Sequence, residues 1–233
     1  MTAPVISVVV PGPAELAEAA ASWTAERITA AVAGRRACYL ALAGGETPRG
    51  CYKRLAGPPY RDSLPWASVF VYWSDERQVP LDDPASNYAM AKAALFDHVP
   101  IPPEQVFPLV GDPTPALRAV PPDVGGRPRF DVIHLGLGED GHTASLFPGS
   151  PALQEAQALV AAVHNASKPP PDRLTLTLPV INAARAVLFM VQGASKREAL
   201  ARVRRRDPAV PASHVQPVDG ELRFIVDRAA AGT

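Results

Sequence analysis

The sequence contains little cysteine, and this scarcity excludes two kinds of small scaffold. Cys38 and Cys51 are the only cysteines among 233 residues, and they do not form a C-x-x-C unit. Two such cysteines provide neither a disulfide framework nor the ligand set of a structural zinc site. We therefore expect buried thiols in a reducing compartment.

The chain also lacks an excess of charge of either sign. Its 23 basic and 23 acidic residues balance, so the formal net charge is zero. Nucleic acids and anionic membranes bind proteins with a basic excess, so the balance argues against both as partners. A small anionic ligand needs only a local cluster of cations and remains compatible with this composition.

Long hydrophobic runs are missing as well. The apolar run near the start, Val5 to Val10, is too short for a membrane span, and no positively charged segment precedes it as in a signal peptide. We therefore expect a cytoplasmic protein, either a monomer or a small homo-oligomer.

What the chain does contain is a regular alternation of strand and helix patterns. Short apolar runs rich in β-branched residues predict strands, and the segments between them predict helices. This alternation predicts a doubly wound α/β fold: a mostly parallel sheet with helices on both faces, in a single domain over residues 1–233. Strands are expected at 5–10, 37–43, 69–73, 132–137, 159–163, 173–178, 187–191 and 222–226, and helices at 14–32, 48–55, 88–96, 143–146, 179–184, after 193 and after 227.

The stretch from Phe130 to Pro148 carries the strongest sign of a functional site. An apolar strand ends at glycines, and the turn Glu139-Asp140-Gly141 places His142 just past its carboxyl end. Open α/β sheets bind ligands at that edge. His142 is the candidate general base, because only its side chain has an ordinary pKa suited to proton transfer near neutrality. The alternative is an ordinary Asp-Gly turn followed by an exposed histidine.

The segment Gly44-Gly45-Glu46-Thr47-Pro48 lies between a predicted strand and a predicted helix. Glycines let the backbone approach an anion, and the N–H groups at a helix start point toward it, so this is a candidate phosphate-binding turn. Glu46 would repel a phosphate unless its carboxylate points away, so contact would depend on the backbone and the Thr47 hydroxyl. A plain strand-to-helix turn explains the same residues.

A third polar cluster, Ser74-Asp75-Glu76-Arg77, closes another predicted strand. Asp75 and Glu76 are candidate acceptors for sugar hydroxyls, and Arg77 offers a planar fork for a phosphate or a developing oxyanion. A surface ion pair is the alternative. Because parallel strands end at one edge of a sheet, we expect the three clusters to meet there, with Lys196 adding a cation.

Several catalytic patterns are absent. The sequence contains no H-E-x-x-H, no His/Cys cluster, no regularly spaced aspartates and no G-x-S-x-G, so neither a metal site nor a serine nucleophile elbow is supported. A complete dinucleotide fingerprint is also lacking. A histidine that activates water, without metal or cofactor, is the simplest remaining chemistry.

Taken together, these motifs resemble the 6-phosphogluconolactonase family, from about residue 5 to the end of the chain. The most specific block is DGHTASLFP at 140–148. The resemblance is carried by Ala43–Pro48, Ser74–Pro80, Ser86-Asn87, Leu135–Pro148, Arg173–Thr177, Gly193–Lys196 and Pro211–Ser213.

The resemblance implies an enzyme that hydrolyses a small phosphorylated sugar lactone, 6-phospho-D-glucono-1,5-lactone, to 6-phosphogluconate in the oxidative pentose phosphate pathway, without metal or cofactor. The family's catalytic histidine falls on His142, and its phosphate loop falls on residues 44–47. The candidate catalytic residues are His142, Asp140 and Arg77, and the candidate substrate-binding residues are Gly44, Gly45, Thr47, Asp75 and Lys196, with Lys168 and Arg173 as further helpers.

Two alternatives remain at this level. An amino-sugar-phosphate deaminase or isomerase is the nearest, but its motif places a glutamate five residues after the active histidine, where this chain has Phe147, and a tyrosine where it has Arg77. The other is a sugar-phosphate-binding protein without turnover; regulators of that kind usually carry a DNA-binding segment, and no basic helix-turn-helix pattern occurs here.

Overall fold

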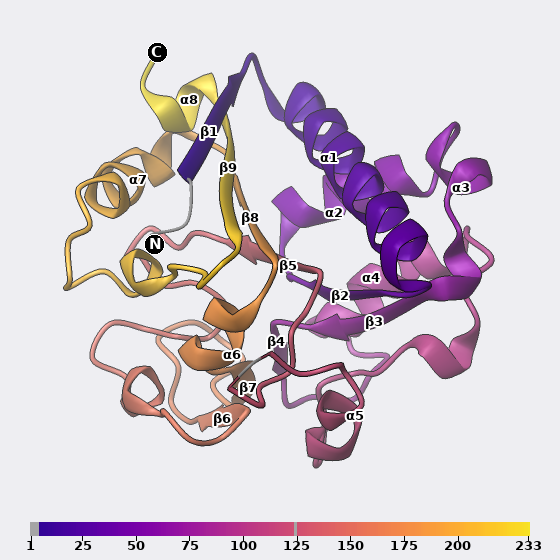
Figure 1. The fold of residues 1–233 in the computed structure, drawn as a ribbon. Helices are drawn as coiled ribbons and strands as arrows, with labels where there is room; N and C mark the ends of the chain where they lie inside the picture. Colours follow the sequence, from indigo (N-terminus) through magenta and orange to yellow (C-terminus); the bar gives the residue numbers. More distant parts are fainter. Residues whose placement is uncertain (1–4, 124) are drawn as a thin grey trace.

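The centre of the molecule is a six-stranded sheet in which all neighbouring strands are parallel, in the order β1-β9-β8-β5-β2-β3 (Figure 1). The computed structural model describes residues 5–123 and 125–233. The strands are β1 (Val5–Val10), β2 (Cys38–Leu42), β3 (Val69–Trp73), β5 (Val132–Gly136), β8 (Ala186–Val191) and β9 (Glu221–Asp227). The predicted mostly parallel sheet is confirmed.

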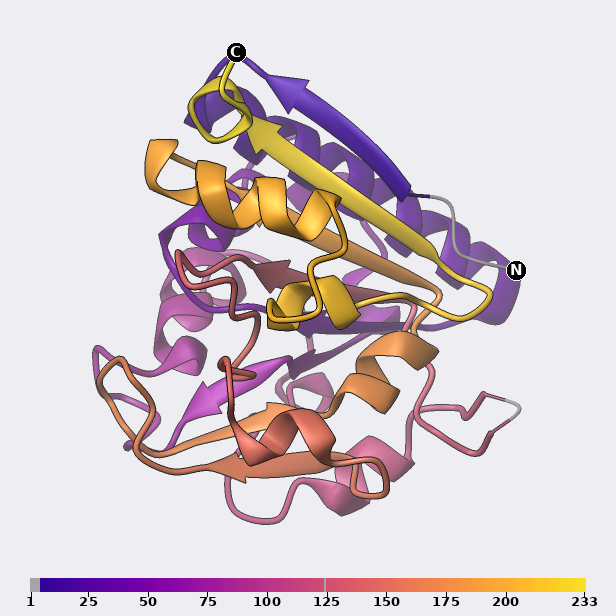
Figure 2. The same cartoon turned by 90° about the vertical axis from the view of Figure 1, so that its left-hand side faces the viewer.

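Helices cover both faces of this sheet. The long α1 (Pro13–Arg35) lies on one face beside α2 (Glu46–Leu55), and α7 (Arg197–Arg204) lies on the other, as Figure 2 shows with α7 in front of the sheet and α1 behind it. Many residues of α1 are alanines, whose small side chains allow close packing on the sheet, and its own Leu16 and Ile28 are fully buried. The doubly wound arrangement predicted from the sequence is therefore present.

The strands expected at 159–163 and 173–178 belong to a second sheet, which the sequence patterns do not predict. It contains three antiparallel strands in the order β4-β7-β6: Asp75–Arg77, Arg173–Leu176 and Val160–Val163. The polar cluster at 75–77, expected just past the end of a strand, is therefore itself a short strand. The alternation of polar and apolar residues at 173–178 predicts a half-exposed strand, and this prediction is wrong, because β7 is the central strand and three of its four side chains are buried.

The predicted helix at 143–146 is wrong. Ala144 has a φ of 47°, in the left-handed region, which ends a right-handed helical turn. Thr143 and Leu146 instead form an isolated bridge, and the Thr143 hydroxyl donates to the Gly136 carbonyl oxygen at 2.9 Å. A compact turn follows β5, where most strands of such a fold lead into a helix.

The remaining elements are short. The predicted helix at 88–96 begins as α4 and continues as a π-helical turn, Lys92–Phe96. Other helices are α3 (Tyr60–Ser63), α4 (Asn87–Ala91), α5 (Thr114–Arg118), α6 (Leu178–Ala183) and α8 (Arg228–Ala231), with 3-10 turns at Trp66–Ser68, Pro103–Gln105, Pro151–Gln154, Ala194–Lys196 and Pro211–His214. None of the helices in the described ranges combines the length and apolar character needed to cross a bilayer.

The strand order has a switch point between β2 and β5. The chain continues from β2 to its neighbour β3 on one side, and from β5 to its neighbour β8 on the other. The connections therefore diverge and leave a crevice beyond the carboxyl ends of the two central strands, which is where open α/β sheets bind ligands.

Candidate active site

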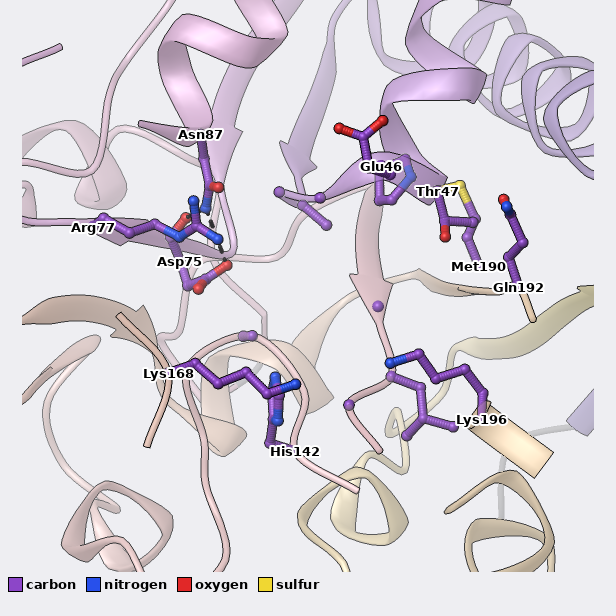
Figure 3. Close-up of a pocket in the computed structure, with 18 of the residues that line it drawn as sticks. Glu46, Thr47, Asp75, Arg77, Asn87, His142, Lys168, Met190, Gln192 and Lys196 are labelled. Carbon is purple, nitrogen blue, oxygen red and sulfur yellow. Dashed lines mark hydrogen bonds between the residues drawn. The ribbon is translucent and has the colours of Figure 1, made fainter. Parts of the chain in front are cut away.

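A cleft of about 330 Å³ occupies this crevice (Figure 3). It is bordered by the turns that follow β2 and β5, by β4, and by the segment after β8. Among the candidate residues, the cleft is lined by Gly44, Gly45, Thr47, Asp75, Arg77, His142 and Lys196, together with Lys168 and Arg173. Asp140 is not part of the lining but contacts His142 from behind.

His142 and Asp140 form a close pair. Nδ1 of His142 lies 2.5 Å from Oδ1 of Asp140, and the imidazole is only 15% exposed. A carboxylate accepts a proton from nitrogen, so this contact places the imidazole proton on Nδ1 and leaves Nε2 as a proton acceptor. Figure 3 shows the ring standing at the edge of the cleft beside Lys168.

The surroundings of the pair keep the imidazole neutral and the carboxylate ionised. Burial lowers the pKa of His142 below its ordinary value, and the Lys168 charge adds to this, although Asp140 opposes it. Burial raises the pKa of Asp140, but the charge of His142 and its hydrogen bonds outweigh that effect, so the pKa of Asp140 is lowered overall. His142 is therefore available as a base over a wider pH range than a free histidine.

The turn after β5 depends on two glycines. A Cβ on Gly138 would lie 2.1 Å from Nδ1 of His142, and Gly141 has a φ of 83° with Val210 packed directly against it. The N–H of Gly138 donates to the His142 carbonyl at 2.8 Å. From a distant part of the chain, the N–H of Ala212 donates to the Gly141 carbonyl at 3.0 Å. These contacts fix the backbone that carries the histidine.

The turn after β2 leads into a helix instead. Gly45, with a φ of 102°, precedes the first turn of α2, and no side chain caps that end. The first N–H groups of a helix have no partner within it, so they are available to an anion. Thr47 faces the cleft (Figure 3), whereas Glu46 is 80% exposed and pairs with Arg49 at 2.9 Å. Glu46 thus borders the cleft, and its carboxylate is paired with Arg49 and exposed to solvent.

Asp75 joins β4 to the turn after β5. Its side chain is almost fully buried, and Oδ2 accepts a hydrogen bond from the Ser145 hydroxyl at 2.6 Å. The Nη1 atom of Arg173 lies 4.0 Å from the same oxygen. Asp75 therefore borders the cleft while holding two chain segments that are 70 residues apart in sequence.

Arg173 lines the cleft, but its donors are directed to a loop. Nη2 donates to the Lys168 carbonyl oxygen at 2.8 Å, and Nε donates to the Pro170 carbonyl oxygen at 3.0 Å. The guanidinium also lies over the ring of Phe147. Arg173 thus supports the loop that presents Lys168, and few of its N–H groups remain for a phosphate.

Cations flank the cleft on both sides. Figure 3 shows Arg77 and Lys168 on one side of His142 and Lys196 on the other. Nη1 of Arg77 donates to the Ala85 carbonyl oxygen at 2.5 Å, which orients its guanidinium. Lys196 lies 3.7 Å from Glu139, whose pKa is lowered by a hydrogen bond from Ser195 and by the Lys196 charge. Such an arrangement is suited to an anionic ligand.

Glu76 does not reach the cleft, so its expected contact with sugar hydroxyls is not supported. It is fully buried and accepts hydrogen bonds from the backbone N–H groups of Asn87 and Tyr88, both at 2.7 Å, at the start of α4. Burial raises the pKa of Glu76, and these N–H groups counteract part of that effect. Glu76 therefore anchors α4 to β4.

Sequence reasoning missed two polar residues in the lining. Asn87 donates to the Asp75 carbonyl oxygen at 2.8 Å, and its side chain occupies the space where Gly44 lacks a Cβ. Gln192 directly follows β8 and borders the cleft. The rule applied to the other strands, a polar residue just past a parallel strand, would have found Gln192. Between residues 5 and 233, apart from residue 124, no three His, Cys, Asp or Glu side chains are grouped as metal ligands.

The fold and the cation-flanked cleft agree with a comparison against protein families. The family described as "Glucosamine-6-phosphate isomerases/6-phosphogluconolactonase" matches residues 11–224, and the chain belongs to this family. Similar curated proteins carry the second of the two names in this description, 6-phosphogluconolactonase. The chain is 41% identical to 6-phosphogluconolactonase of Synechocystis sp. over 92% of each chain, and 36% identical to that of Rattus norvegicus over 98% of this chain and 93% of the relative.

A solved structure of a protein with the same name is also similar to this chain. The structure of 6-phosphogluconolactonase from Trypanosoma brucei superimposes with a TM-score of 0.88 and 30% identity, covering 99% of each chain.

Proposed function

We propose that this protein is a 6-phosphogluconolactonase, an enzyme that hydrolyses 6-phospho-D-glucono-1,5-lactone to 6-phosphogluconate in the oxidative pentose phosphate pathway. The observation that carries the proposal is the His142–Asp140 pair beside a cleft that also contains a glycine turn and cations on both flanks. A phosphorylated lactone requires both a base and an anion site. The names of the relatives support the same activity.

In this proposal, the turn after β2 binds the phosphate of the substrate. The backbone N–H groups from Gly44 to Thr47 and the Thr47 hydroxyl donate to the phosphate oxygens, and Lys196 neutralises charge. Asp75, in the cleft wall, accepts a hydrogen bond from a sugar hydroxyl. The lactone carbonyl then faces Nε2 of His142.

The hydrolysis itself requires one water and one proton shuttle. Nε2 of His142 accepts a proton as the water oxygen bonds to C1, and the carbonyl oxygen becomes an oxyanion. When the carbonyl re-forms, the bond from C1 to the ring oxygen breaks, and the imidazolium returns its proton to that oxygen. Asp140 stabilises the imidazolium between these two steps.

The hydrogen bonds within the turn after β5 reduce the number of groups that can donate to the oxyanion. The N–H groups of Gly138, Gly141 and His142 already donate within that turn. Since the turn after β2 is assigned to the phosphate, Arg77 is the candidate that we test as the donor to the oxyanion. Arg77→Ala distinguishes two roles for the guanidinium: a rise in KM with kcat unchanged assigns it to the phosphate, whereas a fall in kcat assigns it to the oxyanion.

A deaminase or isomerase of amino-sugar phosphates is disfavoured at one position. Phe147, where the deaminase motif has a glutamate, packs its ring against His142 with 4.5 Å between the ring centroids. An apolar ring at this place cannot exchange protons with a substrate. It instead contributes to the burial that keeps His142 neutral.

The direct test is to follow acid release from freshly prepared lactone, with a sample lacking enzyme because this lactone also opens spontaneously. Hydrolysis well above the spontaneous rate is expected. Binding of 6-phosphogluconate without any acceleration would instead make this a sugar-phosphate-binding protein without turnover.

We further infer a cytoplasmic location and a monomer or small homo-oligomer. The location is supported by Cys38 and Cys51, which are both free and buried as in proteins of reducing compartments.

A further inference from the structure

Tyr52 connects α2 back to the end of the strand that precedes it. The side chain is fully buried, and its hydroxyl makes two hydrogen bonds with the backbone of Ala43, each 2.9 Å long. It accepts from the Ala43 N–H and donates to the Ala43 carbonyl oxygen. Ala43 is the residue between the end of β2 and the two glycines of the turn.

The position of Ala43 makes these bonds consequential. Ala43 lies beyond the last residue of β2, so both of its backbone polar groups are outside the strand, and the residue is 3% exposed. Buried backbone groups without partners are costly, so the hydroxyl stabilises one conformation of the chain at this point. The conformation of Ala43 in turn sets the direction in which Gly44 and Gly45 leave the sheet.

The ring of Tyr52 is itself held from the opposite side. It stacks on the imidazole of His134, with 5.9 Å between the centroids, and His134 contacts the Thr24 hydroxyl of α1 at 2.9 Å. Burial lowers the pKa of His134 to about 3, so this support stays uncharged at working pH. Tyr52 is thus fixed between β5 and the turn after β2.

We propose that Tyr52 is a positioning residue for phosphate binding: its hydroxyl sets the geometry of the Gly44–Thr47 turn through Ala43. This inference rests on the assignment of that turn to the phosphate in the proposed function. His142 is held by separate contacts, from Asp140 and Ala212. Loss of the Tyr52 hydroxyl therefore affects binding and leaves the proton-transfer step intact.

The test compares two variants that each remove one buried tyrosine hydroxyl. Tyr52→Phe should raise the KM for lactone and the inhibition constant for inorganic phosphate by about tenfold each, with kcat within about twofold of wild type. Tyr72→Phe is the matched control, because Tyr72 is also buried and its hydroxyl donates to the Ala116 carbonyl oxygen at 3.3 Å, outside the cleft. Both variants are expected to lower Tm, but only Tyr52→Phe should change the two constants.

Two results would overturn the positioning role. One is that the KM for lactone and the inhibition constant for phosphate are the same in Tyr52→Phe and Tyr72→Phe. The other is that kcat falls in Tyr52→Phe while phosphate binding is unchanged. A wild-type protein that neither hydrolyses lactone nor binds phosphate would overturn the proposed function and this inference together. If Tyr52→Phe does not fold, amide hydrogen exchange of the wild type decides. The Ala43 amide should exchange as slowly as those of β2, and fast exchange at Ala43 alone would contradict the proposal.

Discussion

The turns after β2 and β5 begin alike and end differently. Each follows a buried parallel strand, each has a glycine at its second position, and the two strands are neighbours at the switch point. After β2 the chain enters a helix, which presents backbone N–H groups to the cleft. After β5 it folds back on itself, which uses its N–H groups internally and projects one side chain. One glycine turn is thus suited to binding an anion and the other to holding a base.

The strongest test of this division is His142→Ala. Removing the proposed base should lower kcat by about 10³-fold while KM stays within about threefold, because the proposed phosphate contacts lie on the other turn. His98→Ala is the control, since His98 is exposed and lies outside the cleft. Retention of most of the wild-type kcat would show that His142 is not the base.

Alanine substitution of Gly138 and of Gly44 should change different kinetic constants. Gly138→Ala places a methyl group against the His142 ring, and we expect kcat to fall by about 10²-fold because the base is displaced. Gly44→Ala places a methyl group against the Asn87 side chain, only 1.8 Å from its Oδ1, and we expect mainly a rise in KM of about tenfold. Steady-state kinetics of both variants checks the contrast. The same pattern of change in both would remove the distinction between the turns.

The pH profile tests how the Lys168 charge acts on His142 in the turn after β5. Since the pKa of His142 is lowered, kcat/KM should stay high at neutral pH and fall only as the pH drops through a value below that of a free histidine. The Lys168 charge contributes to this lowering, so Lys168→Met should move the acid limb to higher pH. Lys53→Met, an exposed lysine outside the cleft, should leave the limb in place. A limb that moves to lower pH in Lys168→Met would contradict this electrostatic account.

The smallest effect is expected for Glu46→Ser. The exposed carboxylate is paired with Arg49 but still adds negative charge to the rim of the cleft, so the substitution should lower KM by about twofold at low salt. The difference should vanish at high ionic strength. Glu26→Ser on α1 serves as the control, and a KM that rises in Glu46→Ser would indicate that the Glu46–Arg49 pair supports binding.

The sequence was sufficient for the parts of the site that local patterns encode. Apolar runs that stop at glycine identified the ends of β2 and β5, and parallel pairing brought Thr47 and His142 to one edge. Features set by distant contacts were not predictable. The helix expected at 143–146 is prevented by bonds to Gly136 and Asp75, and the three residues of β4 are too few to show a period. The burial of Glu76 depends on α4, which begins 11 residues later.

The order of strands also has a consequence for synthesis on the ribosome. The first strand to emerge, β1, pairs with β9, one of the last segments to be made, and the backbone of the histidine turn is fastened by Ala212. A nascent chain that stops before residue 210 contains every residue that lines the cleft. It still lacks the Ala212 N–H that bonds to the turn carrying His142. We therefore expect the histidine turn to reach its final backbone geometry only when nearly the whole polypeptide has left the exit tunnel, and β1 has no partner strand until then.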